Sequence, residues 1–140
     1  MWRVTQRIEG WPFGECVRAS YASILELPID AVPRFDPASL RSGETQRRRE
    51  RTWLRSKGLS LVELSARVGD ELPDEVLASL PPVEHLISGV SPRGLGHRCV
   101  GFGGRIAHDP HPSRAGLLMV YSVGFLMPVT ATAGLKLVLR

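Results

Sequence analysis

Three residues of types that can perform acyl-transfer chemistry stand out in the chain: Cys16, His97 and Asp109. Cys16 falls at the start of a predicted helix, directly after Pro12-Phe13-Gly14. Free backbone N–H groups and the helix dipole stabilise an anion at such a position. A thiol placed there has a pKa below its ordinary value of about 8.5, above all beside an imidazolium. The position therefore favours a nucleophile, although a buried core residue is the commoner role of an isolated cysteine.

His97 and Asp109 are spaced so that they can act together on such a thiol. His97 opens a predicted strand at 97–102, and Asp109 follows the next predicted strand at 105–108. The two strands are joined at Gly103-Gly104, a strong hairpin signal. In such a hairpin the carboxylate can orient the imidazole and stabilise its charged form. The order of the three residues predicts a thiol-dependent triad, whereas Asp109 taken alone, before a proline, is more typical of a turn.

Two helices that would position the cysteine are predicted in the first half, at 15–27 and 43–57, after an irregular segment at 1–14. The first carries an apolar stripe at helical spacing and ends at Pro28. Many of its other side chains are small, which permits close packing and predicts a central position. The second is arginine-rich and has few apolar anchors. The stripe consists of Val17, Tyr21, Ile24 and Leu25; the anchors are Trp53 and Leu54, with Gly58 as the stop.

The second half changes to the spacing of strands. Strands are predicted at 59–64, 83–90, 97–102 and 105–108, one or two more at 117–129 with Gly124 as a bulge or bend, and a short helix at 73–80. Helices followed by a mostly antiparallel sheet predict an α+β fold. The length of 140 residues predicts one domain over 1–140.

Composition excludes several classes of protein. With 43% hydrophobic and 23% charged residues, the chain is neither disordered nor a membrane protein by composition. No apolar run reaches the roughly 18 residues of a spanning helix, and the first residues lack the apolar stretch of a signal peptide. We therefore expect a cytoplasmic protein with no membrane partner. In that compartment a disulfide between Cys16 and Cys99 is not expected, and nothing in the sequence indicates an oligomeric state.

Two segments resemble the papain-like cysteine peptidase fold, in the compact form of bacteriocin-leader peptidases and of many small phage or bacterial proteins. Residues 14–33, GECVRASYASILELPIDAVP, are similar to the family's Gly-x-Cys helix start with its Leu-Pro and Val-Pro exit. Residues 91–117, SPRGLGHRCVGFGGRIAHDPHPSRAGL, are similar to its histidine strand, turn and strand ending in Asp-Pro. Together they cover about a third of the chain, and residues 34–90 carry no matching motif.

The resemblance implies a role for each residue. Cys16 would be the nucleophile, His97 the general base and Asp109 the orienting carboxylate. Gln6 is the only candidate for the family's oxyanion-donating glutamine, although it lies ten residues before the cysteine. Its alternative role is that of an exposed polar residue near the terminus. Trp11, Gly14 and His111 would contact the substrate.

The activity implied is that of a thiol-dependent hydrolase, a cysteine peptidase or amidase without a cofactor. It would cleave an amide, isopeptide or ester bond in a peptide or protein substrate, or act as a transferase if an amine replaces water. Arg98 and Cys99 depart from the family, which more often has small or apolar residues after the histidine. Because alternate residues of a strand face opposite sides, we expect Arg98 to point away from His97.

A metal site is the first alternative. Its possible ligands are Cys16, His97, Cys99, His108 and His111. No Cys-x-x-Cys or His-x-x-x-His pair supports zinc, so no metal is expected. His108 and His111 are then interpreted as solvated turn residues, or as part of the substrate cleft beside the triad.

Nucleic-acid binding is the second alternative. Segment 41–55 holds six arginines against two glutamates, which accounts for the whole net charge of +4. Arg47, Arg48, Arg49 and Arg51 could follow phosphates. No aromatic residues are interleaved with them, and Trp53 is interpreted as an anchor, so a solvated helix face is favoured. A third alternative is a catalytically inactive scaffold of the same fold.

Overall fold

The computed structural model describes residues 1–129; the last residues of the predicted 1–140 domain, 130–140, lie outside the described part. Helices dominate the first half and strands the second, as predicted for an α+β chain. No helix within residues 1–129 is both long and apolar enough to cross a bilayer. The elements are α1 Cys16–Leu25, η1 Ile29–Ala31, η2 Pro37–Ser39, α2 Gln46–Ser56, β1 Leu59–Ser65, α3 Asp74–Ala78, β2 Glu84–Val90, β3 Gly96–Phe102, β4 Arg105–His108 and β5 Met119–Pro128.

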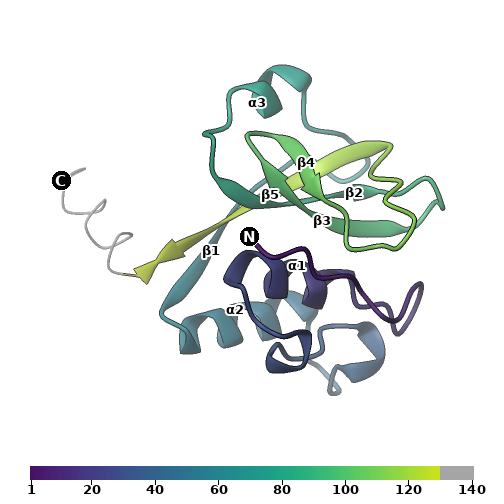
Figure 1. Ribbon diagram of the computed structural model, residues 1–140, viewed down its shortest axis with the longest axis vertical. Coiled ribbons are helices and arrows are strands. Elements are labelled where there is room, and N and C mark those ends of the chain that lie inside the picture. The colour runs from purple at the N-terminus through teal and green to yellow at the C-terminus, as the bar shows by residue number, and fades with distance from the viewer. Residues whose placement is uncertain (130–140) are drawn as a thin grey trace.

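The strands described in residues 1–129 form one five-stranded sheet in the order β1-β5-β2-β3-β4, and every neighbouring pair is antiparallel. The last described strand, β5, therefore lies between β1 and β2. Figure 1 shows α1 and α2 on one side of the sheet and the short α3 on the other. Helix α1 packs against β3, and α2 packs against β1.

Each side of the sheet has its own apolar cluster. Under α1 and α2, the rings of Tyr21, Phe35 and Trp53 pack with centroids 5.6–5.9 Å apart. This packing confirms the predicted role of Trp53 as an apolar anchor of α2. On the other side, Cys99 is fully buried among apolar neighbours. The first cluster contains Tyr21, Ala22, Val32, Phe35, Leu54, Leu61 and Leu86; the second contains Leu72, Ile87, Cys99 and Val123.

Helix α1 is central, as predicted, and one full turn of it, four small residues and Tyr21, is buried. Residues 19–23 are all buried, whereas Val17, Ile24 and Leu25 of the predicted stripe are only partly covered. The small side chains let the helix approach β3 closely: the Ser20 hydroxyl, which donates to the Cys16 carbonyl at 2.7 Å, lies 3.3 Å from the Arg98 carbonyl.

Two details of the predicted elements are wrong. Helix α1 ends at Leu25 because Glu26 adopts the left-handed conformation, with φ of 53°, before Pro28 is reached. Gly124 is not a bulge, since its pairing with β1 runs on without a shift; it is the end pair with β2, and the register shift between β5 and β2 lies at Tyr121 instead. Gly124 serves packing: a β-carbon there would lie 2.9 Å from Leu61 Cδ1.

Candidate active site

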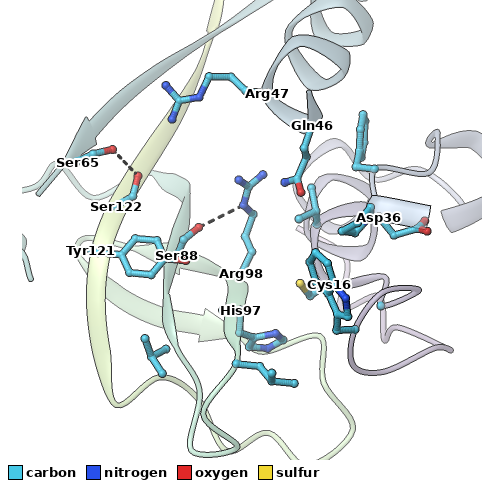
Figure 2. A pocket seen from close by; sticks show the side chains of 18 of the residues that line it. Cys16, Asp36, Gln46, Arg47, Ser65, Ser88, His97, Arg98, Tyr121 and Ser122 are labelled. Carbon is cyan, nitrogen blue, oxygen red and sulfur yellow. Dashed lines mark hydrogen bonds between the residues drawn. The ribbon is translucent and has the colours of Figure 1, made fainter. Parts of the chain in front are cut away.

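Cys16 is the first residue of α1 and lies on the wall of a cavity of about 830 Å³. Its backbone N–H, at the first helical position, has no acceptor within the helix. The side chain is half-buried rather than enclosed in the core. Figure 2 shows this cavity between the helices and the sheet, with Cys16 and His97 at one end. The position is one in which a thiol can meet a ligand.

His97 and Asp109 are adjacent, which confirms the predicted juxtaposition. His97 lies in β3 and Asp109 directly follows β4, and His97 Nε2 is 2.7 Å from Asp109 Oδ1. The carboxylate also accepts the backbone N–H of His111 at Oδ1 (2.9 Å) and that of Gly116 at Oδ2 (2.8 Å). Because Nε2 is engaged by Asp109, Nδ1 is the imidazole nitrogen left for the thiol of Cys16.

The electrostatics of the three groups favour their charged forms. Burial alone would raise the pKa of the Cys16 thiol, but its hydrogen bond to His97 and the charges of His97 and Arg98 lower it below the ordinary value. Burial would lower the pKa of His97, yet Cys16 and Asp109 raise it. The pKa of Asp109 is lowered by His97 and by two backbone N–H groups against the effect of burial. The site thus favours thiolate, imidazolium and carboxylate.

Gln6 lies on the wall of the same cavity and is only 4% exposed, so its alternative role as an exposed polar residue is wrong. Its backbone N–H donates to the Pro110 carbonyl, and its side-chain Nε2 donates to the Ile8 carbonyl, both at 2.9 Å. Within residues 1–129 its Oε1 has no hydrogen-bond partner. A primary amide carries two N–H bonds, so one remains for a second acceptor.

Glu15 is a site residue that the sequence interpretation missed. Its carboxylate is 4% exposed and accepts hydrogen bonds from the backbone N–H groups of Arg7 and Ile8 and from the side chains of Arg7 and Arg18. Burial alone would raise its pKa, but the Arg7 and Arg18 bonds lower it to about 2. Glu15 therefore holds the segment that carries Gln6 against the start of α1. The only signal in the sequence was an acidic residue beside the cysteine.

Arg98 faces the helices, and its contacts are with residues other than His97. Its Nη1 is 2.5 Å from Glu50 Oε1, its Nε donates to Ser88 Oγ at 3.2 Å, and its guanidinium lies over the Tyr21 ring. Glu50, on α2, is 3% exposed. In the sequence this glutamate is only one of two acidic residues in an arginine-rich segment, whereas in the fold it is the buried partner of an arginine next to the candidate triad.

The three predicted substrate contacts all line the cavity. Trp11 is 77% exposed, so its ring is available to a ligand. Gly14 approaches the backbone closely: a β-carbon there would lie 2.5 Å from the Gly10 carbonyl oxygen. His111 has its ring centroid 6.0 Å from that of His97, nearly perpendicular to it, and its Nε2 is 2.5 Å from Glu9 Oε1.

His108 lies apart from these groups, and its interpretation as a solvated turn residue is wrong. It is 5% exposed and donates from Nε2 to the Val4 carbonyl at 2.7 Å. Its hydrogen bond to Val4 leaves it unavailable as one of the possible metal ligands. The role of His108 is to bind the N-terminal segment to the end of β4.

Among the described residues, one group has metal-ligand geometry: His97, Cys99 and Asp109 can each place a ligand atom within 4.8 Å of the others. Both oxygens of Asp109 already accept hydrogen bonds. Burial, together with the nearby Asp109 charge, raises the pKa of the Cys99 thiol, which keeps it protonated. A metal needs the thiolate, so the chemistry of this group favours hydrogen bonding over metal binding.

Several of the arginines considered for nucleic-acid binding have partners within the protein. Arg47 and Arg51 both pair with Glu63, at 3.3 and 3.2 Å, and Arg49 pairs with Glu44 at 2.6 Å. Arg48 is exposed. The helix is therefore less strongly basic at its surface than the sequence indicates.

Comparison with protein-family models finds no matching family, and comparison with curated proteins and with solved structures finds no significant match. The functional argument consequently rests on the geometry of the site.

Proposed function

We propose that this chain is a thiol-dependent acyl hydrolase with a papain-like arrangement, in which Cys16, His97 and Asp109 form the catalytic triad. The observation that carries the proposal is the Cys16 thiol, at the open start of α1, in hydrogen-bond contact with an imidazole that a buried carboxylate holds at 2.7 Å. The groups face a cavity of about 830 Å³, large enough for several residues of a peptide.

In the proposed reaction, the thiolate of Cys16 attacks a carbonyl carbon, and a C–S bond forms while the carbonyl oxygen becomes an oxyanion. The tetrahedral species collapses, the bond to the leaving amine or alcohol breaks, and His97 gives that group its proton. Water then loses a proton to His97 and attacks the thioester. The C–S bond breaks, the carboxylic acid leaves, and the thiolate–imidazolium pair is restored. Asp109 keeps the imidazole oriented throughout.

The oxyanion would be stabilised by the backbone N–H of Cys16 and by the second N–H of the Gln6 amide. Both groups lie on the cavity wall, and Glu15 fixes the segment that carries Gln6. Trp11 and His111 would contact the substrate around the scissile bond. An amide, an isopeptide and an ester all offer the required carbonyl, and no step calls for a metal or a cofactor.

The first test is the pH dependence of iodoacetamide alkylation, with Cys16 and Cys99 quantified separately by peptide mass spectrometry. Because the pKa of the Cys16 thiol is lowered, we expect fast labelling at pH 6 that is lost in His97→Ala. Cys99 is fully buried and has a raised pKa, so it is the internal control and should stay unlabelled in the folded protein. Slow labelling of Cys16 with an ordinary thiol midpoint would refute the ion pair.

Cys16→Ser and Cys99→Ser form a matched pair of variants. Cys16→Ser should abolish hydrolysis of an activated ester and leave the urea midpoint nearly unchanged, because the side chain is only half-buried. Cys99→Ser should retain hydrolysis, because Cys99 does not line the cavity, and should lose about 1–3 kcal/mol of unfolding free energy, since the smaller oxygen leaves space within an apolar cluster. The reverse pattern would make Cys16 a structural residue.

A further inference from the structure

Helix α2 presents an open groove whose lining contains no acidic and no apolar side chain. The groove is lined by Thr45, Arg47, Arg48, Arg51, Thr52, Arg55 and Ser56. Guanidinium and hydroxyl groups are donors that bind carboxylates or phosphates. The groove is therefore complementary to an anionic ligand.

The positive charge of the groove is only partly neutralised within the protein. Arg47 and Arg51 share a single partner, Glu63. Arg48 and Arg55 are exposed, and neither guanidinium has a hydrogen bond or ion pair with another residue among 1–129. Four arginines thus face one carboxylate, and the surplus charge is available to a ligand.

The groove adjoins the candidate active site at one shared residue. Arg47 lines both the groove and the cavity that contains Cys16. Figure 2 shows Arg47 at one end of the cavity, Arg98 in the middle, and His97 with Cys16 at the other end. A ligand bound at the α2 groove can therefore extend past Arg47 into the cavity that contains the thiol.

We propose that the substrate is a polypeptide with an acidic segment, and that the α2 groove binds this segment while the scissile bond reaches Cys16. This inference rests on the proposed function, because thiol acyl chemistry requires a carbonyl, which a polypeptide supplies at every residue. Nucleic acid fits the groove less well. The aromatic residue of α2, Trp53, is packed against Tyr21 and Phe35 and offers no face for base stacking.

The direct test measures the affinity of the Cys16→Ser protein for poly-L-glutamate. Because this variant lacks the thiol, the measurement reports binding at the groove without catalysis. We expect binding that weakens as salt rises, since exposed charges are screened. Arg48→Glu/Arg55→Glu should weaken it by about tenfold or more, because the charge of the groove reverses. Arg3→Glu/Arg105→Glu is the control of equal charge change: both residues are exposed and lie outside the groove. It should change the affinity by less than about twofold.

A second measurement tests whether a ligand bound at the groove also reaches the Cys16 thiol. Poly-L-glutamate should slow alkylation of Cys16 in the unmodified protein and should not slow it in Arg48→Glu/Arg55→Glu. Equal losses of affinity in the groove variant and the control, or tighter binding of a single-stranded oligonucleotide than of poly-L-glutamate at the same salt, would overturn the proposal. If Cys16 shows an ordinary thiol midpoint while the groove still binds poly-L-glutamate, the proposed hydrolase fails and the acidic-ligand groove stands.

Discussion

At the thiol of Cys16, two cations act from consecutive positions of β3. His97 approaches with the imidazole that Asp109 holds, and Arg98 contributes from the helical side of the strand. Arg98 is fixed by Glu50, whose pKa is lowered by Arg98 and Tyr21 although burial raises it. A buried carboxylate on α2 therefore determines where the second cation lies.

Replacing Arg98 should affect both stability and the thiol. In Arg98→Met, Glu50 remains buried without its cation, and we expect a loss of about 3–5 kcal/mol of unfolding free energy. The alkylation midpoint of Cys16 should rise, because one of the charges that lowers its pKa is removed. Arg98→Lys keeps a positive charge, so its alkylation midpoint should lie between those of Arg98→Met and the unmodified protein. The measurements are urea unfolding and the pH profile of alkylation.

Ser88→Ala is the control for this prediction. It removes only the hydrogen bond from Arg98 Nε and keeps the charge, so the alkylation midpoint should stay in place. An unchanged midpoint in folded Arg98→Met would show that Arg98 contributes to packing alone.

Among the elements, segment 1–14 and α1 are joined at one carboxylate. Glu15 collects two backbone and three side-chain hydrogen bonds from Arg7, Ile8 and Arg18. Its pKa in the fold is about 2, against an ordinary value of 4.5. A depressed pKa means that the stabilisation is complete above pH 4.5 and is lost as the pH falls toward 2.

Glu15→Gln should therefore cost stability near neutral pH, by about 3 kcal/mol for hydrogen bonds to a charged group in a buried site. The difference from the unmodified protein should shrink as the pH is lowered from 4.5 toward 2. Urea unfolding at several pH values measures it. Glu71→Gln, at an exposed position, is the control and should cost almost nothing. A cost that does not depend on pH would mean that the charge of Glu15 is unimportant.

The sequence predicted elements that local signals determine. Gly103 and Gly104 both adopt positive φ, at 58° and 83°, so the hairpin that pairs His97 with Asp109 could be inferred from two glycines. The Arg98–Glu50 pair could not, because 48 residues separate its members and nothing local links them. The position of β5 between β1 and β2 could not be predicted either, because hydrophobic periodicity identifies strands but does not show which strands pair.

Across the whole molecule, the N-terminal segment connects the helical side to the sheet side. The backbone N–H of Val4 donates to Ser23 Oγ on α1, and the Val4 carbonyl accepts from His108 at the end of β4. Two residues later, Gln6 bonds to Pro110 beyond β4. The two walls of the cavity are therefore linked by a segment that itself carries a candidate site residue.

Protonation of His108 should weaken the contact between the N-terminal segment and β4 at acid pH. Burial, with Arg114 and Arg3 nearby, lowers the pKa of His108, although the Val4 carbonyl raises it. Its stabilisation is thus present above the ordinary value near 6.5 and is lost as the pH falls through the lowered value. In His108→Gln, which keeps a donor for Val4 and cannot be protonated, the drop in urea midpoint between pH 7 and pH 5 should be smaller. An equal drop would assign the acid sensitivity to other groups.

The central position of β5 bears on when the thiol becomes reactive during synthesis. Helix α1 is made before the described strands, yet β1 is joined to β2 only through β5, which is made after every other described element. Contacts between segments so far apart in the chain form late in folding. A nascent chain that stops before residue 119 has no strand to close the sheet. The order of synthesis thus delays assembly of the cavity around Cys16 until residues 119–128 have been made.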